Sequence, residues 1–99
     1  MLNITKNAND SNLNVALEGR LDTTTAPQLE SELKESLGGV KELVLDMANL
    51  QYISSAGLRV LLSAQKIMNK QGSMVIKNAS DEIMEIFEVT GFVDILTIV

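Results

Sequence analysis

The chain has 99 residues, a formal net charge of −5, 45% hydrophobic residues, and neither histidine nor cysteine. This length allows one compact domain, residues 1–99, and not two. The acidic balance argues against nucleic-acid or anionic-membrane partners. Without cysteine or histidine, disulfides, thiolate metal sites and the commonest general base are excluded. We therefore expect no metal, no cofactor and no enzyme activity.

The hydrophobic segments bear on where the protein acts. Residues 1–10 lack a basic cluster followed by an apolar run, which argues against a signal peptide. No apolar stretch approaches the roughly 18–20 residues of a membrane span. We therefore expect a soluble, cytoplasmic protein.

The first elements are predicted to form a hairpin. Leu2 and Ile4 alternate with polar residues, as in an edge strand, and residues 7–12 are rich in Asn, Asp and Ser, as in a turn. Leu13, Val15 and Leu17 then alternate with polar or small residues, which predicts a half-buried strand.

The first helix is predicted to open at Thr25, with Pro27 in its first turn. Gln28 follows Thr25 by three residues, so we expect a capping box between these two side chains. The glycine pair 38–39 ends the helix. Its buried stripe comprises Leu29, Leu33 and Leu37.

The middle of the chain predicts a central strand over Glu42–Met47 and a long helix over Ser55–Lys70. The stripe of this helix comprises Val60, Leu61, Ala64, Ile67 and Met68. Leu58 and Leu62 widen the stripe. They either reach the core or form an exposed apolar edge for docking.

The last third predicts a strand over 74–76, a helix over Asp81–Val89 capped by Ser80, and a terminal strand over Ile95–Val99. The resulting order is β-β-α-β-α-β-α-β. Strands joined by helices favour parallel pairing with right-handed crossovers. We therefore expect an α/β fold, with a small mixed β-sheet of about five strands and helices chiefly on one side.

Two adjacent serines, Ser54 and Ser55, stand where the chain enters the second helix. The first turn of a helix offers unpaired backbone N–H groups and the positive end of the helix dipole. Either serine suits an N-cap, and a hydroxyl placed there can also carry a phosphate. Ala56 and Gly57 add little bulk, which leaves room for another protein's backbone.

Residues 50–62, Leu-Gln-Tyr-Ile-Ser-Ser-Ala-Gly-Leu-Arg-Val-Leu-Leu, resemble the signature of the STAS family, the sulphate transporter and anti-sigma factor antagonist domains. Gly19-Arg20-Leu21-Asp22 and Thr90-Gly91-Phe92 match two further family motifs in the right order. The resemblance covers roughly residues 2–99 and is greatest for stand-alone anti-sigma factor antagonists. It implies a STAS-like fold and a regulatory binding module.

By this resemblance, Ser55 matches the serine that antagonists present for phosphorylation, and Ser54 is the second choice. Ser54 stands where several relatives carry Asp, and Arg59 where they often carry Gly. The resemblance places Asp22 near the Ser55 loop, to contact the partner or to orient the serine; the alternative is a structural carboxylate in a turn. The residues expected to bind the partner are Asp22, Thr23, Ser54, Ser55, Ala56, Gly57, Leu58 and Arg59.

The resemblance implies the following cycle. The unmodified protein binds an anti-sigma factor that is also a serine kinase, and so frees a sigma factor. Phosphorylation of Ser55, with ATP bound by the partner, releases the complex until a phosphatase resets it. The alternatives are a STAS scaffold in another signalling or envelope-transport complex without phosphorylation, and a small nucleotide- or lipid-binding protein. Gly-x-Ser-x-Gly is absent, since Ile53 replaces its first glycine, and no Walker loop occurs.

Overall fold

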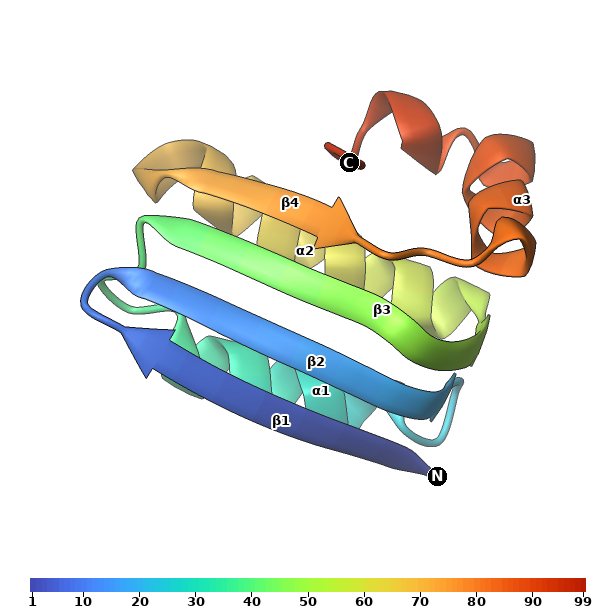
Figure 1. The fold of residues 1–99 in the computed structure, drawn as a ribbon, viewed down its shortest axis with the longest axis horizontal. Coiled ribbons are helices and arrows are strands. Elements are labelled where there is room, and N and C mark those ends of the chain that lie inside the picture. The colour runs from blue at the N-terminus through green and yellow to red at the C-terminus, as the bar shows by residue number, and fades with distance from the viewer.

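Strands and helices alternate through most of the chain and form two layers (Figure 1). The computed structural model describes residues 1–99. Its elements are β1 (Leu2–Asn9), β2 (Asn12–Leu21), α1 (Ala26–Ser36), β3 (Glu42–Ile53), α2 (Ser55–Gln71), β4 (Ser73–Lys77), α3 (Asp81–Thr90) and the short 3-10 helix η1 (Phe92–Asp94).

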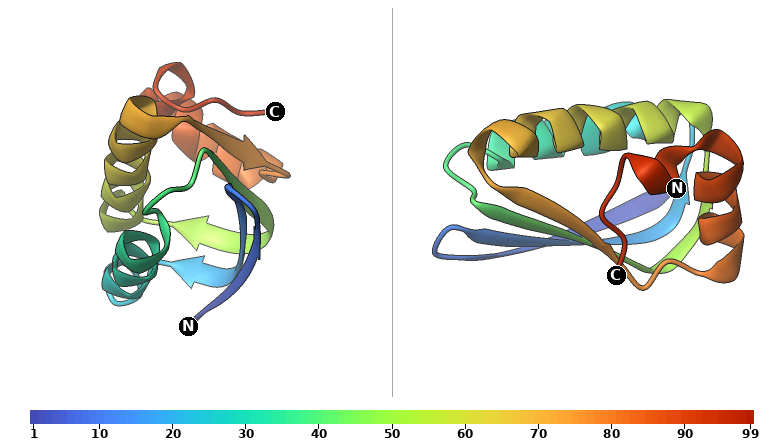
Figure 2. Two further views of the ribbon diagram at one scale, coloured as in Figure 1. Left: turned by 90° about the vertical axis from the view of Figure 1, so that its left-hand side faces the viewer. Right: turned by 90° about the horizontal axis from the view of Figure 1, so that it is seen from above.

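The sheet is mixed, with four strands in the order β1-β2-β3-β4. β1 and β2 pair antiparallel, and β2 pairs with β3, and β3 with β4, in parallel. α1 and α2 lie side by side on one face of the sheet, and the opposite face is left open (Figures 1 and 2). The predicted α/β class, and the helices on one side, are confirmed.

The predicted hairpin is present, and its strands are longer than expected. β1 and β2 pair from Leu2↔Gly19 to Asn9↔Asn12, so only Asp10 and Ser11 remain for the turn. Asp10 has a positive φ of 55°, a conformation that Asp and Asn tolerate better than most residues. The Asn-rich stretch therefore belongs mostly to the strands.

The capping box predicted for α1 is wrong. The Thr25 hydroxyl caps no helical N–H; it donates to Arg20 O (2.8 Å) and accepts from the backbone N–H of Asp22 (2.8 Å). Gln28 instead donates through its side chain to Leu2 O (3.3 Å). Because both partners are supplied by β1 and β2, the sequence spacing within the helix could not reveal them.

β3 continues well beyond the predicted end at Met47, to Ile53. Leu50 and Ile53 are buried, and β2 stays paired with this extension because register shifts occur between Ala16 and Glu18 and between Gly19 and Arg20. Ser54 alone separates β3 from α2. The tandem serines therefore lie directly at a strand-to-helix junction.

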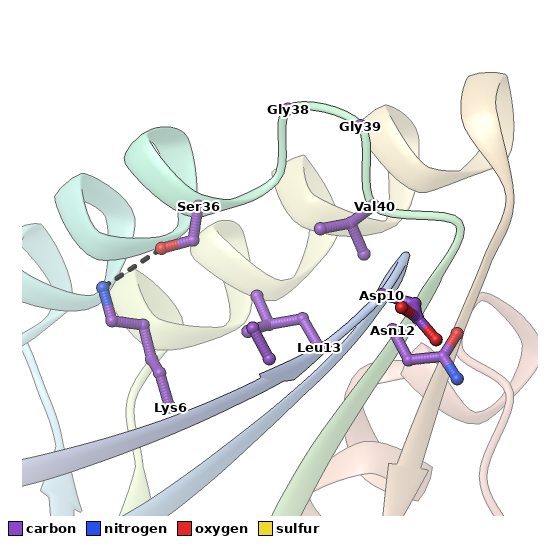
Figure 3. A pocket seen from close by; sticks show the side chains of 9 residues that line it. Lys6, Asp10, Asn12, Leu13, Ser36, Gly38, Gly39 and Val40 are labelled. Atoms are coloured by element: carbon purple, nitrogen blue, oxygen red, sulfur yellow. Dashed lines mark hydrogen bonds between the residues drawn. The ribbon is translucent and has the colours of Figure 1, made fainter.

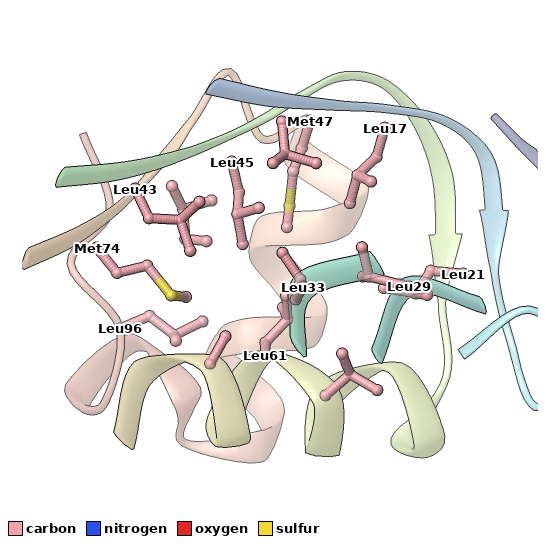
Figure 4. Packing of buried hydrophobic residues seen from close by; sticks show 14 of the residues in the cluster. Leu17, Leu21, Leu29, Leu33, Leu43, Leu45, Met47, Leu61, Met74 and Leu96 are labelled. Atoms are coloured by element: carbon pink, nitrogen blue, oxygen red, sulfur yellow. The ribbon is translucent and has the colours of Figure 1, made fainter. Parts of the chain in front are cut away.

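The core lies between the sheet and its helices and is almost entirely aliphatic (Figure 4). Phe87 is its one fully buried aromatic side chain. Leu58 is only 5% exposed, so it belongs to the core, and Leu62 is half-buried. The prediction that Ile67 is buried is wrong: it is 36% exposed, because it borders the shallow groove between α1 and α2.

α3 forms as predicted, with Ser80 Oγ accepting from the backbone N–H of Ile83 (3.2 Å). The predicted fifth strand over Ile95–Val99 is wrong, and the sheet has four strands. The chain turns through η1, and only Ile98 pairs with β4, as one isolated bridge to Ile76. Residues 95–99 alternate between exposed and more buried positions as a strand would, but they lack the continuous pairing that a strand requires.

Candidate functional site at the start of helix α2

Two strand-to-helix junctions lie next to each other at one end of the sheet. β2 leads into α1 and β3 leads into α2, and the last residues of these strands, Leu21 and Ile53, are register partners. The backbone N–H of Ser54 donates to Leu21 O (2.8 Å), which joins the two junctions directly. The structure therefore brings the Asp22 loop beside the Ser55 loop.

Asp22 organises the first junction. Its Oδ1 accepts from the Thr24 hydroxyl (2.7 Å), the Thr24 N–H (3.0 Å) and the Thr25 N–H (3.1 Å). These bonds, led by that from the Thr24 hydroxyl, lower the Asp22 pKa from 3.8 to about 2. Asp22 is thus an anionic turn residue at neutral pH, and its other oxygen, Oδ2, lies 3.9 Å from Arg20 Nε.

The two serines of the second junction have different environments. Ser54 is the N-cap: its backbone is extended, and its Oγ accepts from the Gly57 N–H (3.3 Å). Ser55 is the first residue of α2, is exposed, and its hydroxyl forms no hydrogen bond within the chain. The cap function therefore belongs to Ser54, and the Ser55 hydroxyl is free for chemistry at a helix N-terminus.

Gly57 serves packing within the chain. A Cβ at this position would lie 2.7 Å from Leu21 Cγ and 3.0 Å from Ile53 Cγ1, so only glycine lets α2 approach the strand ends this closely. Gly57 and Leu58 are both interior. The predicted contact residues that have surface to offer are Asp22, Thr23, Ser54, Ser55, Ala56 and Arg59.

Sequence reasoning missed a pair beside these loops. Arg20 and Tyr52 are register partners on β2 and β3, both are exposed, and the Arg20 guanidinium carbon lies 4.5 Å from the Tyr52 ring centroid. This stacking is a cation–π contact. The signal was available, because Tyr52 is one of only three aromatic residues and adjoins the serine motif.

The largest hollow, about 420 Å³, lies at the other end of the sheet, beside the β1–β2 turn and the end of α1 (Figure 3). Lys6 there donates to Ser36 Oγ (3.1 Å) and pairs with Glu32 (2.5 Å). Nowhere do three or more acidic side chains gather as a metal site would require. No helix combines the length and the apolar character needed to cross a membrane.

The STAS domain model matches residues 3–99. BtrV of Bordetella bronchiseptica, a provisionally named anti-sigma factor antagonist, is 37% identical over 98% of this chain and 85% of its own. The anti-sigma-B factor antagonist of Bacillus subtilis is 29% identical over 98% and 90%.

Solved structures agree on the fold. An anti-sigma factor antagonist from Mycobacterium paratuberculosis superposes with a TM-score of 0.89, at 19% identity, over 99% of this chain and 85% of its own. The phosphorylated form of the Bacillus protein SpoIIAA superposes with a TM-score of 0.76, at 16% identity, over 98% and 91%. Fold, motif order and family match agree along the whole length, and the chain belongs to the STAS domain family.

Proposed function

We propose that the protein is an anti-sigma factor antagonist controlled by phosphorylation of Ser55. In the unmodified state it binds an anti-sigma factor that is also a serine kinase, which frees the sigma factor. Transfer of phosphate from the partner's ATP to Ser55 dissociates the complex, and a phosphatase restores binding. The relatives named as antagonists support the role, and the phosphorylated state of SpoIIAA is a precedent within the same fold.

The proposal rests on the different hydrogen bonding and exposure of the two serine hydroxyls. Ser54 is engaged in capping α2, whereas the Ser55 hydroxyl is exposed and unbonded one residue later. Neither the Ser55 nor the Ala56 backbone N–H has a partner outside the helix. These groups and the helix dipole can accommodate an anion, so a phosphate on Ser55 need not disturb the fold.

The release step follows from electrostatics at the interface. A phosphoserine carries about −1.5 to −2 charges at neutral pH. A partner carboxylate about 4 Å away would be repelled by roughly 4 kcal/mol per charge pair at an effective dielectric near 20. Each 1.4 kcal/mol is about a tenfold loss of affinity, so one such contact weakens the complex by two to three decades. No second conformation of the antagonist is needed.

The test combines phosphate mapping with binding. The purified protein is incubated with ATP and each anti-sigma factor kinase of the source organism, and the modified residue is located by mass spectrometry. Ser55→Ala should abolish phosphorylation and keep binding. Ser54→Asn is the matched control, because Asn removes the hydroxyl but still caps the helix; it should leave phosphorylation at Ser55 intact. Ser55→Asp should weaken binding at least tenfold.

The outcomes separate the candidates. Phosphate on Ser54, or on neither serine with any kinase, contradicts the proposed switch. Binding without phosphorylation would favour the STAS scaffold role. A small molecule released from the purified protein on denaturation would favour nucleotide or lipid binding.

A further inference from the structure

The net negative charge of the protein lies in its C-terminal segment. All eight Lys and Arg residues lie within residues 1–77 together with eight of the 13 acidic residues, so that part is formally neutral. The whole net charge of −5 therefore lies in residues 78–99, which include α3 and η1. The five acidic residues there are exposed and form no ion pair within the chain: Asp81, Glu82, Glu85, Glu88 and Asp94.

Helix stability explains only part of this pattern. Asp81 and Glu82 occupy the first turn of α3, where negative charge is favourable. Glu88 lies in the last turn, where the helix dipole disfavours negative charge. Glu85 and Glu88 therefore bring repulsion without a compensating contact inside the molecule.

The same helix carries apolar side chains on two sides. Ile83 and Phe87 are fully buried against the core. Ile86 and Val89 share another face with Glu82 and Glu85, at the i, i+3, i+4, i+7 spacing of one helical stripe. With Thr90 these four residues line a shallow hollow of about 250 Å³. Val89 is 80% exposed, so its side chain contributes little to the folded chain.

We propose that this face of α3 is a second contact for the anti-sigma factor, which offers Lys or Arg side chains to Glu85 and Glu88 and an apolar side chain to the hollow at Val89. α3 stands at the end of the sheet where α2 begins, as Figure 1 and the right-hand view of Figure 2 show. One partner can therefore cover the Ser55 loop and α3 together. The identity of this partner rests on the proposed function.

Other occupants fit less well. A nucleic acid would be repelled by the acidic residues. The carboxylates do not converge as ligands of a cation would. A basic protein surface with an apolar side chain matches both the charge and the exposed Val89. Charges of one sign on the protein mainly accelerate its association with a partner of the opposite charge, and salt screens this attraction.

The test compares two double variants that change the net charge by the same amount, one on α3 and one elsewhere on the surface. Glu85→Lys/Glu88→Lys alters the α3 face and places cations toward the helix C-terminus, where the dipole favours them. Glu35→Lys/Glu42→Lys is the matched control, because both residues are exposed, form no ion pair and lie near the opposite end of the sheet. Val89→Ser tests the apolar contact without changing charge.

Association and dissociation rates with the anti-sigma factors are measured for these variants and for Ser55→Asp. At about 0.05 M salt, the α3 reversal should lower the association rate at least about tenfold and the control less than about threefold. Near 0.5 M salt this difference should largely vanish. Val89→Ser should raise the dissociation rate about three- to tenfold.

Equal effects of the α3 reversal and the control would overturn this inference and leave the Ser55 proposal standing. A loss of binding by the α3 reversal but not by Ser55→Asp would support the α3 contact and contradict the switch. If no anti-sigma factor binds the wild-type protein, both proposals are wrong.

Discussion

At the β2–α1 junction the polar side chains are bonded to one another, whereas at the β3–α2 junction one of two serines is left free. Asp22 and Thr25 hold the first turn through bonds to backbone groups and to Thr24. At the second junction Ser54 caps the helix and Ser55 faces solvent. Two neighbouring loops rich in hydroxyl side chains can therefore have different roles. The first stabilises the fold, and the second presents a hydroxyl that can be modified.

Removing one hydroxyl from each junction should have very different effects on stability, and this is the largest difference that we expect. Thr25 is 7% exposed, and Thr25→Val leaves the Asp22 N–H without its acceptor. We expect a loss of about 1–3 kcal/mol in the free energy of unfolding. Ser55→Ala should change it by less than about 0.5 kcal/mol. Urea denaturation measures both, and equal losses would show that the junctions do not differ in this way.

Gly57→Ala tests the packing beneath the free serine. The added Cβ would collide with Leu21 and Ile53, and the repacking should outweigh the gain in helix propensity. We expect a net destabilisation of about 1–2 kcal/mol. Thermal and urea unfolding would check this, with Ala56→Gly as a propensity control. A stabilised Gly57→Ala variant would mean that the strand ends yield more easily than the structure implies.

Ser54→Ala separates capping from signalling within the second junction. Loss of the bond to the Gly57 N–H should cost about 1 kcal/mol of unfolding free energy. Ser54→Asp should recover most of this, since Asp caps helices as well as Ser does. Urea denaturation measures both variants. If Ser55→Ala were instead the more destabilising change, the assignment of the cap would be reversed.

The last comparison concerns the pH dependence of stability. The Asp22 pKa is about 2 in the folded state and 3.8 in its ordinary state, so its stabilisation is complete above pH 3.8 and is lost as the pH falls toward 2. The stability difference between the protein and Asp22→Asn should therefore shrink over that range. Hydrogen bonds from the Ala48 N–H and Asn78 also lower the pKa of Asp46, so the comparison is made in an Asp46→Asn background. A difference independent of pH would contradict this role of Asp22.

Periodicity alone predicted most of the fold, because each helix buries a stripe and the hairpin strands alternate. It failed where pairing with distant segments decides the structure. β3 continues through exposed Ala48 and Asn49 because shifted pairing with β2 supports it. Residues 95–99 have strand-like composition, yet they meet β4 at only one bridge.

Family resemblance located the site. The sequence could not predict which of the two serines caps α2 and which is left free. Either serine could have been the cap; the extended backbone at Ser54 and its bond to Leu21 O decide between them. The Thr25–Gln28 spacing is the same for a capping box and for the observed network. Only the nearness of Arg20 O and Leu2 O selects the latter.

Under the proposed role, the different functions of Ser54 and Ser55 also predict how mutant alleles behave in the cell. Because the Ser55 side chain supports no part of the fold, mutations that remove its hydroxyl should leave the protein at normal abundance in the cell. Such alleles would produce a permanently active antagonist, dominant over a wild-type copy, whereas damage at Thr25 or Gly57 would produce recessive loss of the protein.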